Sequence, residues 1–590
     1  MAGLFHNRKL TMPNDMSPAP GLTVSVGSYS AAGRKRVNQD FHGAMLPEGR
    51  SLRLKGIVLA VADGISTSPV SREAAETCVK ALLTDYYCTT DSWTAKTAAS
   101  RVMTATNSWL HAQSRRAHLE SIDLGWVCTL SAMILKHRTA HLFHVGDSRI
   151  SRLSGESLEP LTRAHHLTLS AGEFCLSRAM GAAADLEIDY HAVDLEIGDI
   201  FLLTTDGIHD HVPARAIAAA LRIAPDLDAA AQAIAEEATA LGSPDNLTIQ
   251  IVRIDGLPES ALDVPSVEGG HLLPPPLPET GAEIDGYTIL RPIHASHRSH
   301  IFLAAAPDGS RVALKIPSMD MREDPAYLRR FLMEEWVARR LANPHIVAAV
   351  PAPEAKSVLY TLSEFVEGRT LRQWMADNPN PDLDLVRDIV RQIAQGLRAF
   401  HRQEMLHQDL RPENVMIDGD GTVKIIDLGS TYIAGVDEAE PEQRDILGTL
   451  QYAAPEYFNG DPVTWTADLF SLGIITYEML TGRLPYGTAV SRVRSRRDLG
   501  RLAYRSACDE KNGVPDWMDE ALRRAVHPHP EQRQQALSEF DLELRQPGAG
   551  WRARKRRPFA ERDPVRFWKI ISLILAILVV LLLVRGAGAL

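Results

Sequence analysis

Four aspartates in the first half of the chain each stand at one end of an apolar run that is typical of a buried β-strand. Asp63, Asp147 and Asp206 follow such runs, and Asp245 precedes one. Acidic side chains at strand ends place their oxygens at one rim of a sheet, and Mg²⁺ and Mn²⁺ prefer oxygen ligands. Two such ions can activate a water molecule and neutralise a phosphoryl group. A single aspartate of this kind is more often part of a turn, but four together predict a site for divalent metals.

The second half of the chain carries a different set of polar residues. A strand-like run ends in Lys315, and Glu334 lies in the helical stretch that follows, where it can pair with that lysine. Asp409, Asn414 and Asp427 come later, in polar loops. Phosphoryl transfer from a nucleotide needs a lysine on the phosphates, two metal-holding groups and a carboxylate near the incoming hydroxyl. These residues provide all of them in a plausible order.

These two sets of residues lie in separate parts of the chain, which at 590 residues is too long for one hydrophobic core. In residues 21–255, β-rich apolar runs alternate with alanine-rich helical stretches, whereas residues 284–546 begin β-rich and continue as mainly helical sequence. Residues 256–283 are rich in proline and glycine and predict a stiff linker, with a ligand for a proline-recognition domain as the alternative. We therefore expect two folded domains.

The overall composition excludes several classes of protein. An apolar fraction of 45% with 23% charged residues is ordinary for a globular protein, and a net charge of −11 argues against a nucleic-acid partner. The five cysteines are scattered and lack metal-binding spacing, so we expect buried thiols in a reducing cytosol. Residues 1–20 contain no apolar run, which predicts a flexible N-terminus without a secretory signal.

The last residues of the chain differ from the rest in being apolar. From Ile570 to Val584 every residue except Ser572 is apolar. A helix of this run is about 22 Å long, shorter than the roughly 30 Å membrane core, but its neighbours bring residues 567–590 near spanning length. We expect a transmembrane tail anchor there, with a buried C-terminal helix as the alternative. Basic residues concentrate in the preceding segment 547–566, which predicts contact with anionic membrane lipid, a single-pass position in the cytoplasmic (inner) membrane and both domains in the cytosol.

The motifs of the first domain resemble those of the metal-dependent Ser/Thr phosphatases of the type 2C family. Six short motifs occur in the order of the family: Arg34–Asp40, Asp63-Gly64, Gly146–Arg149, Leu176–Gly181, Asp206-Gly207 and Ser243–Asn246. The resemblance covers residues 21–255 and implies an α-β-β-α sandwich with two central sheets. The resemblance is specific, because six short motifs occur in the order of the family across the whole domain.

The same resemblance implies ligands for the ions and for the substrate. Two Mg²⁺ or Mn²⁺ ions would be held by Asp63, the Gly64 carbonyl, Asp206 and Asp245, with Asp40 acting through water and Asp147 suiting a weaker third ion. The arginine that binds substrate phosphate is Arg34 or Arg36, because the spacing to Asp40 is not the usual one. Gln39 stands where many members carry glutamate. No histidine stands at Ile65 to act as an acid, so we expect water to protonate the leaving group.

The motifs of the second domain resemble those of eukaryotic-like Ser/Thr protein kinases over residues 284–546, which implies a bilobal α+β fold. These motifs are Val312–Lys315, His407–Asn414, Asp427–Gly429, Gly448–Tyr452, Ala454–Glu456 and Asp468–Gly473, with Arg533 as a partner for Glu456. The resemblance implies that Lys315 anchors the phosphates of ATP, that Glu334 holds Lys315, and that Asp409 orients the substrate hydroxyl. It also implies that Asn414 and Asp427 bind Mg²⁺.

Further kinase positions follow from the same resemblance. Ser363 is the small residue that guards the nucleotide pocket, Glu364 to Val366 form the hinge, and Arg411 replaces the usual lysine near the γ-phosphate. Gln408 stands where many related kinases carry an arginine that pairs with a loop phosphate, so we expect activity without that phosphorylation. The loop over the phosphates, residues 293–300, lacks glycine, which restricts the approach of backbone N–H groups to phosphate.

We expect a bifunctional bacterial enzyme that phosphorylates and dephosphorylates Ser and Thr of proteins, possible substrates including the chain itself. One alternative is a phosphatase whose kinase-like domain is inactive and serves as a regulatory or docking module. A second alternative is a membrane scaffold that uses both domains for docking. The glycine-poor loop separates the first two hypotheses, whereas the retained metal- and phosphate-directed side chains argue against the third.

Overall fold

The computed structural model of the chain describes residues 21–117, 124–170, 173–258, 272–437, 451–552 and 564–587, with gaps at 297, 322–323, 352, 354–355, 460, 488, 491–492, 494, 509–512 and 549. The predicted flexible N-terminus, much of the predicted linker, the Gly448-Thr449 pair and the basic run from Arg554 to Arg557 lie outside the described residues. The chain divides into two compact units, one of residues 1–266 with 433–443 and one of residues 267–432 with 444–590.

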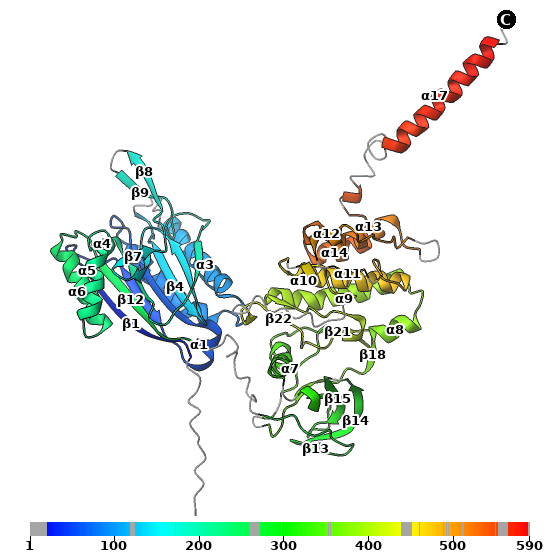
Figure 1. Cartoon of the computed structure of the whole chain (residues 1–590), viewed down its shortest axis with the longest axis horizontal. Coiled ribbons are helices and arrows are strands. Elements are labelled where there is room, and N and C mark those ends of the chain that lie inside the picture. Colours follow the sequence, from blue (N-terminus) through cyan, green and yellow to red (C-terminus); the bar gives the residue numbers. More distant parts are fainter. Residues whose placement is uncertain are drawn as a thin grey trace, which may run out of the picture. The chain divides into compact units, whose positions relative to one another are not determined.

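The first unit contains two five-stranded antiparallel sheets packed face to face (Figure 1). One sheet has the order β1 (Thr23–Ala31), β12 (Leu247–Gly256), β11 (Ile200–Thr204), β6 (Arg149–Ser154) and β7 (Ser157–Pro160). The other has the order β10 (Asp189–Asp194), β5 (Thr139–Val145), β4 (Leu130–Lys136), β3 (Ile57–Ala62) and β2 (Phe41–Met45). Leu59, Met133, Leu203 and Val252 belong to the core cluster that fills the space between the sheets.

Helices cover the outer face of each sheet. Helices α2 (Ser71–Cys88) and α3 (Ala95–Arg116) share a core cluster with β3 and β4, whereas α5 (Ala214–Ile223) and α6 (Leu227–Ala240) share one with β11 and β12. The smaller elements are α1 (Gly49–Lys55), α4 (Asp206–His209) and the hairpin of β8 (His166–Ser170) and β9 (Glu173–Leu176). The resulting order of layers is the predicted α-β-β-α sandwich.

Local sequence explains how these layers form. All six residues of β3 are buried, because this strand has a sheet on one side and helices on the other. The Thr94 hydroxyl caps α3 by accepting from the N–H of Thr97, and Asp226 caps α6 in the same way. Gly27 of β1 lets α6 approach closely, since a Cβ there would lie 2.2 Å from the backbone of Leu227. The helices are therefore fixed at their starts and against the sheets.

The second unit begins with a five-stranded sheet and one helix. The sheet has the order β13 (Glu283–Ile284), β14 (Tyr287–Ala295), β15 (Ser299–Ala305), β16 (Arg311–Pro317) and β17 (Thr361–Glu364), and the helix is α7 (Pro325–Ala338). Asp324 caps α7, and Pro325 occupies its first turn, where the missing N–H costs nothing. The 3-10 turn η2 (Met319–Met321) lies between β16 and α7.

The rest of the second unit is mainly helical. Its helices are α8 (Leu371–Asp377), α9 (Leu383–Arg402), α10 (Glu456–Asn459), α11 (Thr466–Thr481), α12 (Arg496–Leu499), α13 (Asp516–Ala525) and α14 (Leu537–Arg545), with 3-10 turns η3 (Pro412–Asn414) and η6 (Pro530–Gln532). Its strands are β18 (Gly368–Thr370), β20 (Val415–Asp418) and β21 (Val423–Ile425) in one sheet and β19 (Met405–Leu406) with β22 (Tyr432–Ile433) in another. A β-rich lobe followed by a helical lobe is the predicted bilobal arrangement.

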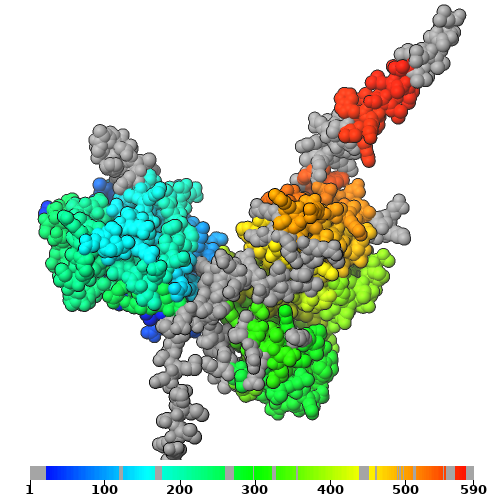
Figure 2. Space-filling view, in the orientation of Figure 1, coloured from blue at the N-terminus to red at the C-terminus, as the bar shows by residue number. Residues whose placement is uncertain are grey.

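Helix α17 (Pro564–Ala587) covers the apolar run at the end of the chain. Most of its described apolar side chains are exposed (the red helix in Figure 2), and Leu573, for example, has 62% of its surface exposed. Among the helices formed by the described residues, none is long and apolar enough to cross a membrane. The membrane span predicted for residues 567–590 is therefore not confirmed.

Candidate active sites

The five aspartates predicted to bind metal come from both sheets of the first unit and lie near one another. They are Asp40 just before β2, Asp63 just after β3, Asp147 between β5 and β6, Asp206 at the start of α4 and Asp245 before β12. The charge of Asp40 acts on Asp63, and the Thr205 hydroxyl donates to Asp40 Oδ2 over 3.0 Å. The N–H of Thr129 donates to the Asp63 carbonyl over 2.8 Å. Both sheets therefore contribute acidic groups to one region.

Burial and mutual repulsion raise the pKa values of three of these carboxyl groups. Burial is the largest cause in each case. The charges of Asp40, Asp206 and Asp147 add to it for Asp63, whose pKa lies well above its usual value. For Asp206, burial and the charges of Asp245, Asp147 and Asp40 raise the pKa to about 7. Because nearby positive charge favours ionised carboxylates, this cluster is suited to a cation.

The donor set fits divalent cations. Asp40 Oδ1 and Asp206 Oδ1 are buried without a hydrogen-bond partner, an arrangement that costs free energy unless a cation binds there. Gly64 is fixed beside them, since its N–H donates to the Gln39 carbonyl over 3.2 Å and it forms a β-bridge with Cys128. Within the described residues, no three acidic, histidine or cysteine side chains are already arranged as a metal site.

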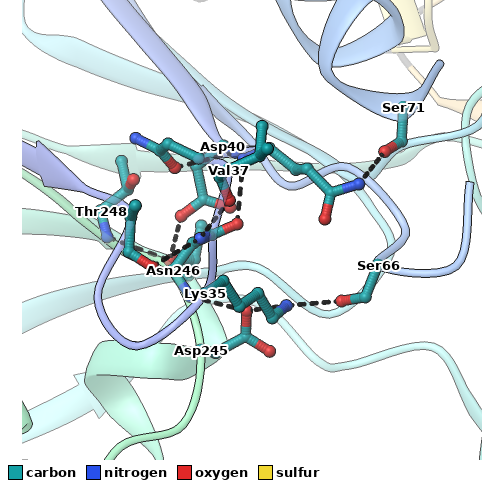
Figure 3. A network of polar contacts seen from close by, with 12 residues as sticks. Lys35, Val37, Asp40, Ser66, Ser71, Asp245, Asn246 and Thr248 are labelled. Atoms are coloured by element: carbon teal, nitrogen blue, oxygen red, sulfur yellow. Dashed lines mark hydrogen bonds and ion pairs between the residues drawn. The ribbon is translucent and has the colours of Figure 1, made fainter. Parts of the chain in front are cut away.

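A lysine that the sequence analysis missed lies at this cluster. Lys35 Nζ forms an ion pair with Asp245 and donates to Ser66 Oγ over 2.5 Å (Figure 3). Both predicted phosphate ligands, Arg34 and Arg36, are exposed, and Arg34 donates to the Thr239 carbonyl over 3.5 Å. Lys35, the middle one of three consecutive basic residues, is therefore the one that contacts an aspartate of the cluster.

The loop that carries Lys35 is held in shape by a buried amide. Asn246 Nδ2 donates to the carbonyls of Ala32 and Val37 over 2.9 and 3.0 Å, and Asn246 Oδ1 accepts from the N–H of Gln39 over 2.9 Å (Figure 3). The Gln39 side chain donates to Ser71 Oγ over 2.8 Å, so the residue that replaces glutamate positions the loop against α2. These hydrogen bonds fix the loop conformation in which Lys35 points toward the aspartates. The sequence carries no periodic pattern from which this conformation could be predicted.

In the second unit, Lys315 lies between two predicted partners. Its Nζ is 2.7 Å from Glu334 Oε2 and 3.3 Å from Asp427 Oδ1. Burial would lower the pKa of Lys315, but the charges of Asp427 and Glu334 outweigh burial and raise it above its usual value. The charge of Lys315 in turn lowers the pKa of Asp427, whereas burial raises that of Glu334. The lysine is therefore positively charged and joins α7 to the predicted Mg²⁺ ligand.

Two of the predicted catalytic residues, Asp409 and Arg411, lie with Asn414 between β19 and β20. Asn414 Nδ2 donates to the Asp409 carbonyl over 2.9 Å and to Asp409 Oδ2 over 3.1 Å, and Arg411 Nε lies 3.7 Å from the same oxygen. Gln408 has a φ of 65°, a left-handed conformation that a side chain rarely adopts. Asp468 holds this strained residue, since its Oδ1 accepts from the N–H of Gln408 over 3.1 Å.

The predicted nucleotide-pocket residues lie on the strand next to Lys315. Ser363 and Glu364 belong to β17 and pair with Ala313 and Val312 of β16. Glu364 Oε1 accepts from Lys424 Nζ over 2.8 Å. Val366, just after β17, is buried. The segment predicted as a hinge therefore follows directly from the strand that is paired with the lysine-bearing one.

The glycine-poor turn between β14 and β15 uses its own backbone donors. Ser296 Oγ accepts from the N–H groups of Arg298 and Ser299 over 3.3 and 3.1 Å. The Arg298 carbonyl accepts from the Tyr327 hydroxyl of α7 over 2.7 Å. These N–H groups are thus occupied by a side chain, whereas a glycine-rich loop would leave them for phosphate.

Comparisons with known proteins agree with this geometry. The family model for a protein kinase domain matches residues 295–540, and that for protein phosphatase 2C matches residues 28–243. The chain therefore combines a protein phosphatase 2C domain with a protein kinase domain. Its sequence relatives include proteins named as Ser/Thr protein kinases, and its structural relatives include Ser/Thr phosphatases.

Individual relatives match only part of their own length. PknA of Corynebacterium glutamicum, named as a Ser/Thr protein kinase, is 35% identical over 30% of this chain and 38% of the relative. PrkC of Bacillus subtilis is 33% identical over 35% of this chain and 32% of the relative. The chain thus spans about a third of the length of these curated relatives. The solved phosphatase PstP/Ppp of Mycobacterium tuberculosis is 23% identical over 40% of this chain and 99% of that chain, with a TM-score of 0.34.

Proposed function

We propose that this chain is a bifunctional enzyme, which phosphorylates Ser and Thr of proteins with ATP and hydrolyses phosphoserine and phosphothreonine on proteins. The observation that carries the proposal is the presence of two clusters of charged side chains on one chain. One is the contact of Lys315 with both Glu334 and Asp427. The other is the cluster of mutually repelling aspartates that includes Asp63 and Asp206.

In the phosphatase domain, two bound Mg²⁺ or Mn²⁺ ions would supply an activated water and neutralise the phosphoryl oxygens. Asp63, the Gly64 carbonyl, Asp206 and Asp245 are the groups proposed to hold them. Lys35, at the rim of this cluster, supplies a positive charge for the phosphate of the substrate. The unpartnered oxygen of Asp206 supports this assignment.

In the kinase domain, Lys315 binds the phosphates of ATP and Glu334 holds the lysine in place. Asp409 orients the hydroxyl of the substrate, and its hydrogen bond with Asn414 fixes its direction. Asn414 and Asp427 are the groups proposed to hold Mg²⁺. Arg411, which lies near Asp409, replaces the usual lysine and keeps its positive charge near the γ-phosphate.

One experiment tests both activities on the full chain. Purified protein is incubated with labelled ATP and Mn²⁺, as wild type, as Asp206→Ala, and as Asp206→Ala with Asp409→Ala. We expect phosphate to accumulate on the Asp206→Ala protein, because a kinase domain tethered to a phosphatase domain modifies the chain and its own phosphatase removes the label. The double variant should stay unlabelled. An unlabelled Asp206→Ala protein would argue against self-antagonism, and a failure to phosphorylate any added protein would refute the kinase activity.

The structure also favours one alternative: a phosphatase with an inactive kinase-like domain that serves as a regulatory or docking module. The specific observation is Ser296, whose hydroxyl occupies the N–H groups of Arg298 and Ser299. Replacing Ser296 by glycine distinguishes the two readings. Tighter binding of ATP with a retained phosphoryl transfer supports an active kinase that is slowed by its loop, whereas ATP binding without transfer supports the docking module.

For the end of the chain we propose attachment to membrane lipid in the cytosolic face of the inner membrane. Support comes from the exposed apolar side chains of α17 and from the basic residues of segment 547–566. Co-sedimentation of the full chain with vesicles that contain anionic lipid tests it. A chain truncated after residue 546 is the matched control, and equal sedimentation of both would contradict the proposal.

A further inference from the structure

Arg372, near the start of α8, fills a small acidic cluster in the kinase domain. Its Nε lies 2.8 Å from Glu413 Oε1, and its Nη1 lies 2.9 Å from Glu478 Oε1. Its Nη2 donates to the hydroxyl of Tyr452, and that hydroxyl donates to Glu478 Oε2 over 2.6 Å. One guanidinium therefore satisfies two carboxylates and a phenol.

The cluster lies beside the residues proposed to orient the substrate. Glu413 belongs to η3, the same short turn as Asn414, whose amide bonds Asp409. The side chains of Arg372 and Glu413 are 37% and 41% exposed, so a polypeptide that presents a hydroxyl to Asp409 can reach them from solvent. The backbone of Tyr452 is fixed against α11, because its carbonyl accepts a hydrogen bond from Ser471 Oγ over 2.8 Å.

The position of α8 does not depend on Arg372. A capping box between Thr370 and Gln373 closes the start of the helix, and Leu371 and Trp374 bury its apolar face. A surface ion pair adds little to the stability of a helix that is already capped and packed. The three contacts of Arg372 therefore call for a reason other than holding α8.

The charges of the cluster suggest a role for Arg372 in substrate recognition. Glu413 and Glu478 each accept a hydrogen bond from the guanidinium of Arg372, over 2.8 and 2.9 Å. Without the guanidinium, Glu413 and Glu478 would present two carboxylates and a phenolic oxygen. Such a group binds arginine well, because carboxylates accept bidentate hydrogen bonds from guanidinium.

We propose that Arg372 sets the substrate specificity of the kinase by occupying, from within the chain, an acidic subsite that would otherwise bind a basic residue of the protein substrate. The wild-type kinase then has no preference for arginine near the phosphorylated Ser or Thr. Removal of the guanidinium opens the subsite and creates that preference. This inference rests on the proposed kinase activity.

The test uses the full chain with Asp206→Asn in every sample, so that hydrolysis does not hide phosphorylation. Each peptide of a panel carries one serine among alanines, and an arginine stands at one of three positions on either side. The kcat/KM values come from release of ADP. For Arg372→Ala we expect one or more arginine peptides to gain about tenfold over the all-alanine peptide. Arg372→Lys, the matched control, should show no such gain, and adding Glu478→Gln to Arg372→Ala should abolish it.

The outcomes separate this inference from the kinase activity itself. If the wild type releases no ADP with any peptide or with itself, the proposed activity fails and the inference falls with it. If Arg372→Ala retains turnover of the alanine peptide but shows unchanged selectivity, the inference alone is overturned. If Arg372→Ala loses all turnover, the selectivity of Arg372→Gln for arginine peptides is measured instead. If both variants lose turnover, Arg372 has a structural role and the inference is overturned.

Discussion

Replacing Lys35 by alanine gives a direct test of the phosphatase site. Lys35 is 24% exposed, as is its partner Asp245, and its Nζ donates to Ser66 Oγ over 2.5 Å. When metal ions neutralise Asp245, the ammonium group is released from this pair and lies at the rim of the site, where it can bind the phosphate of a substrate. Lys35→Ala should therefore raise KM for phosphopeptides more than it lowers kcat.

The size of this effect follows from the contact that is lost. A hydrogen bond to a charged group contributes about 1.5–3 kcal/mol, which corresponds to about a ten- to hundredfold change in kcat/KM. Because the lysine retains a quarter of its exposure, solvent screens its charge, and we expect the lower end of this range, about tenfold. Lys35→Arg should keep most of the activity, since it retains the charge.

The assay is the initial rate of phosphate release from a phosphothreonine peptide by the full chain in saturating Mn²⁺. Arg34→Ala and Arg36→Ala are matched controls, because both neighbours carry the same charge and are exposed, and Arg34 donates to the Thr239 carbonyl. Each should stay within about threefold of wild type. A larger loss in either arginine variant than in Lys35→Ala would refute the assignment.

Three further predictions concern stability and the kinase. The folded-state pKa of Asp206 is about 7, above its usual value, so this residue should make the metal-free phosphatase lose up to about 4 kcal/mol of stability as pH rises from about 4 to about 7. Asp206→Asn should reduce this slope in thermal unfolding with chelator, and Asp40 and Asp63, whose pKa values are also raised, account for what remains. Lys315→Met should lower autophosphorylation by on the order of a hundredfold or more while the rate of phosphopeptide hydrolysis stays unchanged. Arg533→Ala should lower the unfolding free energy of the kinase domain by about 3–5 kcal/mol, because it leaves Glu456 buried and unpaired; an unchanged denaturation midpoint would contradict this.

The sequence predicts the layers of the phosphatase domain because its strands are continuous apolar runs. The segment that became β3 is buried on both faces, and a run of that composition has few alternatives. Aspartates at the ends of such runs follow the strands into place. The sequence also predicts helix α9, because Val386, Ile389 and Val390 recur with helical spacing, and all three are buried in the structure.

The functional side chains that the sequence analysis missed depend on turns and long-range contacts. Lys35 is one of three consecutive basic residues, and only the fold of its loop, in which Lys35 donates its N–H to Ala32 and Asn246 holds the flanking backbone, decides which one faces the aspartates. Arg372 meets Glu413 and Glu478 from distant parts of the chain. Neither contact leaves a periodic signal, so neither could be predicted from spacing.

The two sites differ in how they balance charge, and this difference has consequences for how each is assembled. In the kinase site, Lys315 forms ion pairs with both Glu334 and Asp427, so the fold holds the site together before ATP binds. In the phosphatase site, burial and repulsion raise the pKa values of Asp63 and Asp206, and one oxygen each of Asp40 and Asp206 is buried without a hydrogen-bond partner. Protons and metal ions therefore compete for these carboxylates, since ligands must be deprotonated to bind metal.

It follows that removing metal should act on the two domains unequally. A chelator should destabilise the phosphatase domain at pH 8, where its carboxylates are charged and repel one another, and should do so less at pH 5, where Asp206 is protonated. The kinase domain has no such pair of uncompensated charges at Lys315, so its unfolding should respond little at either pH. Two unfolding transitions of the full chain, of which one moves with chelator and pH, would support this account, and a common shift of both would contradict it.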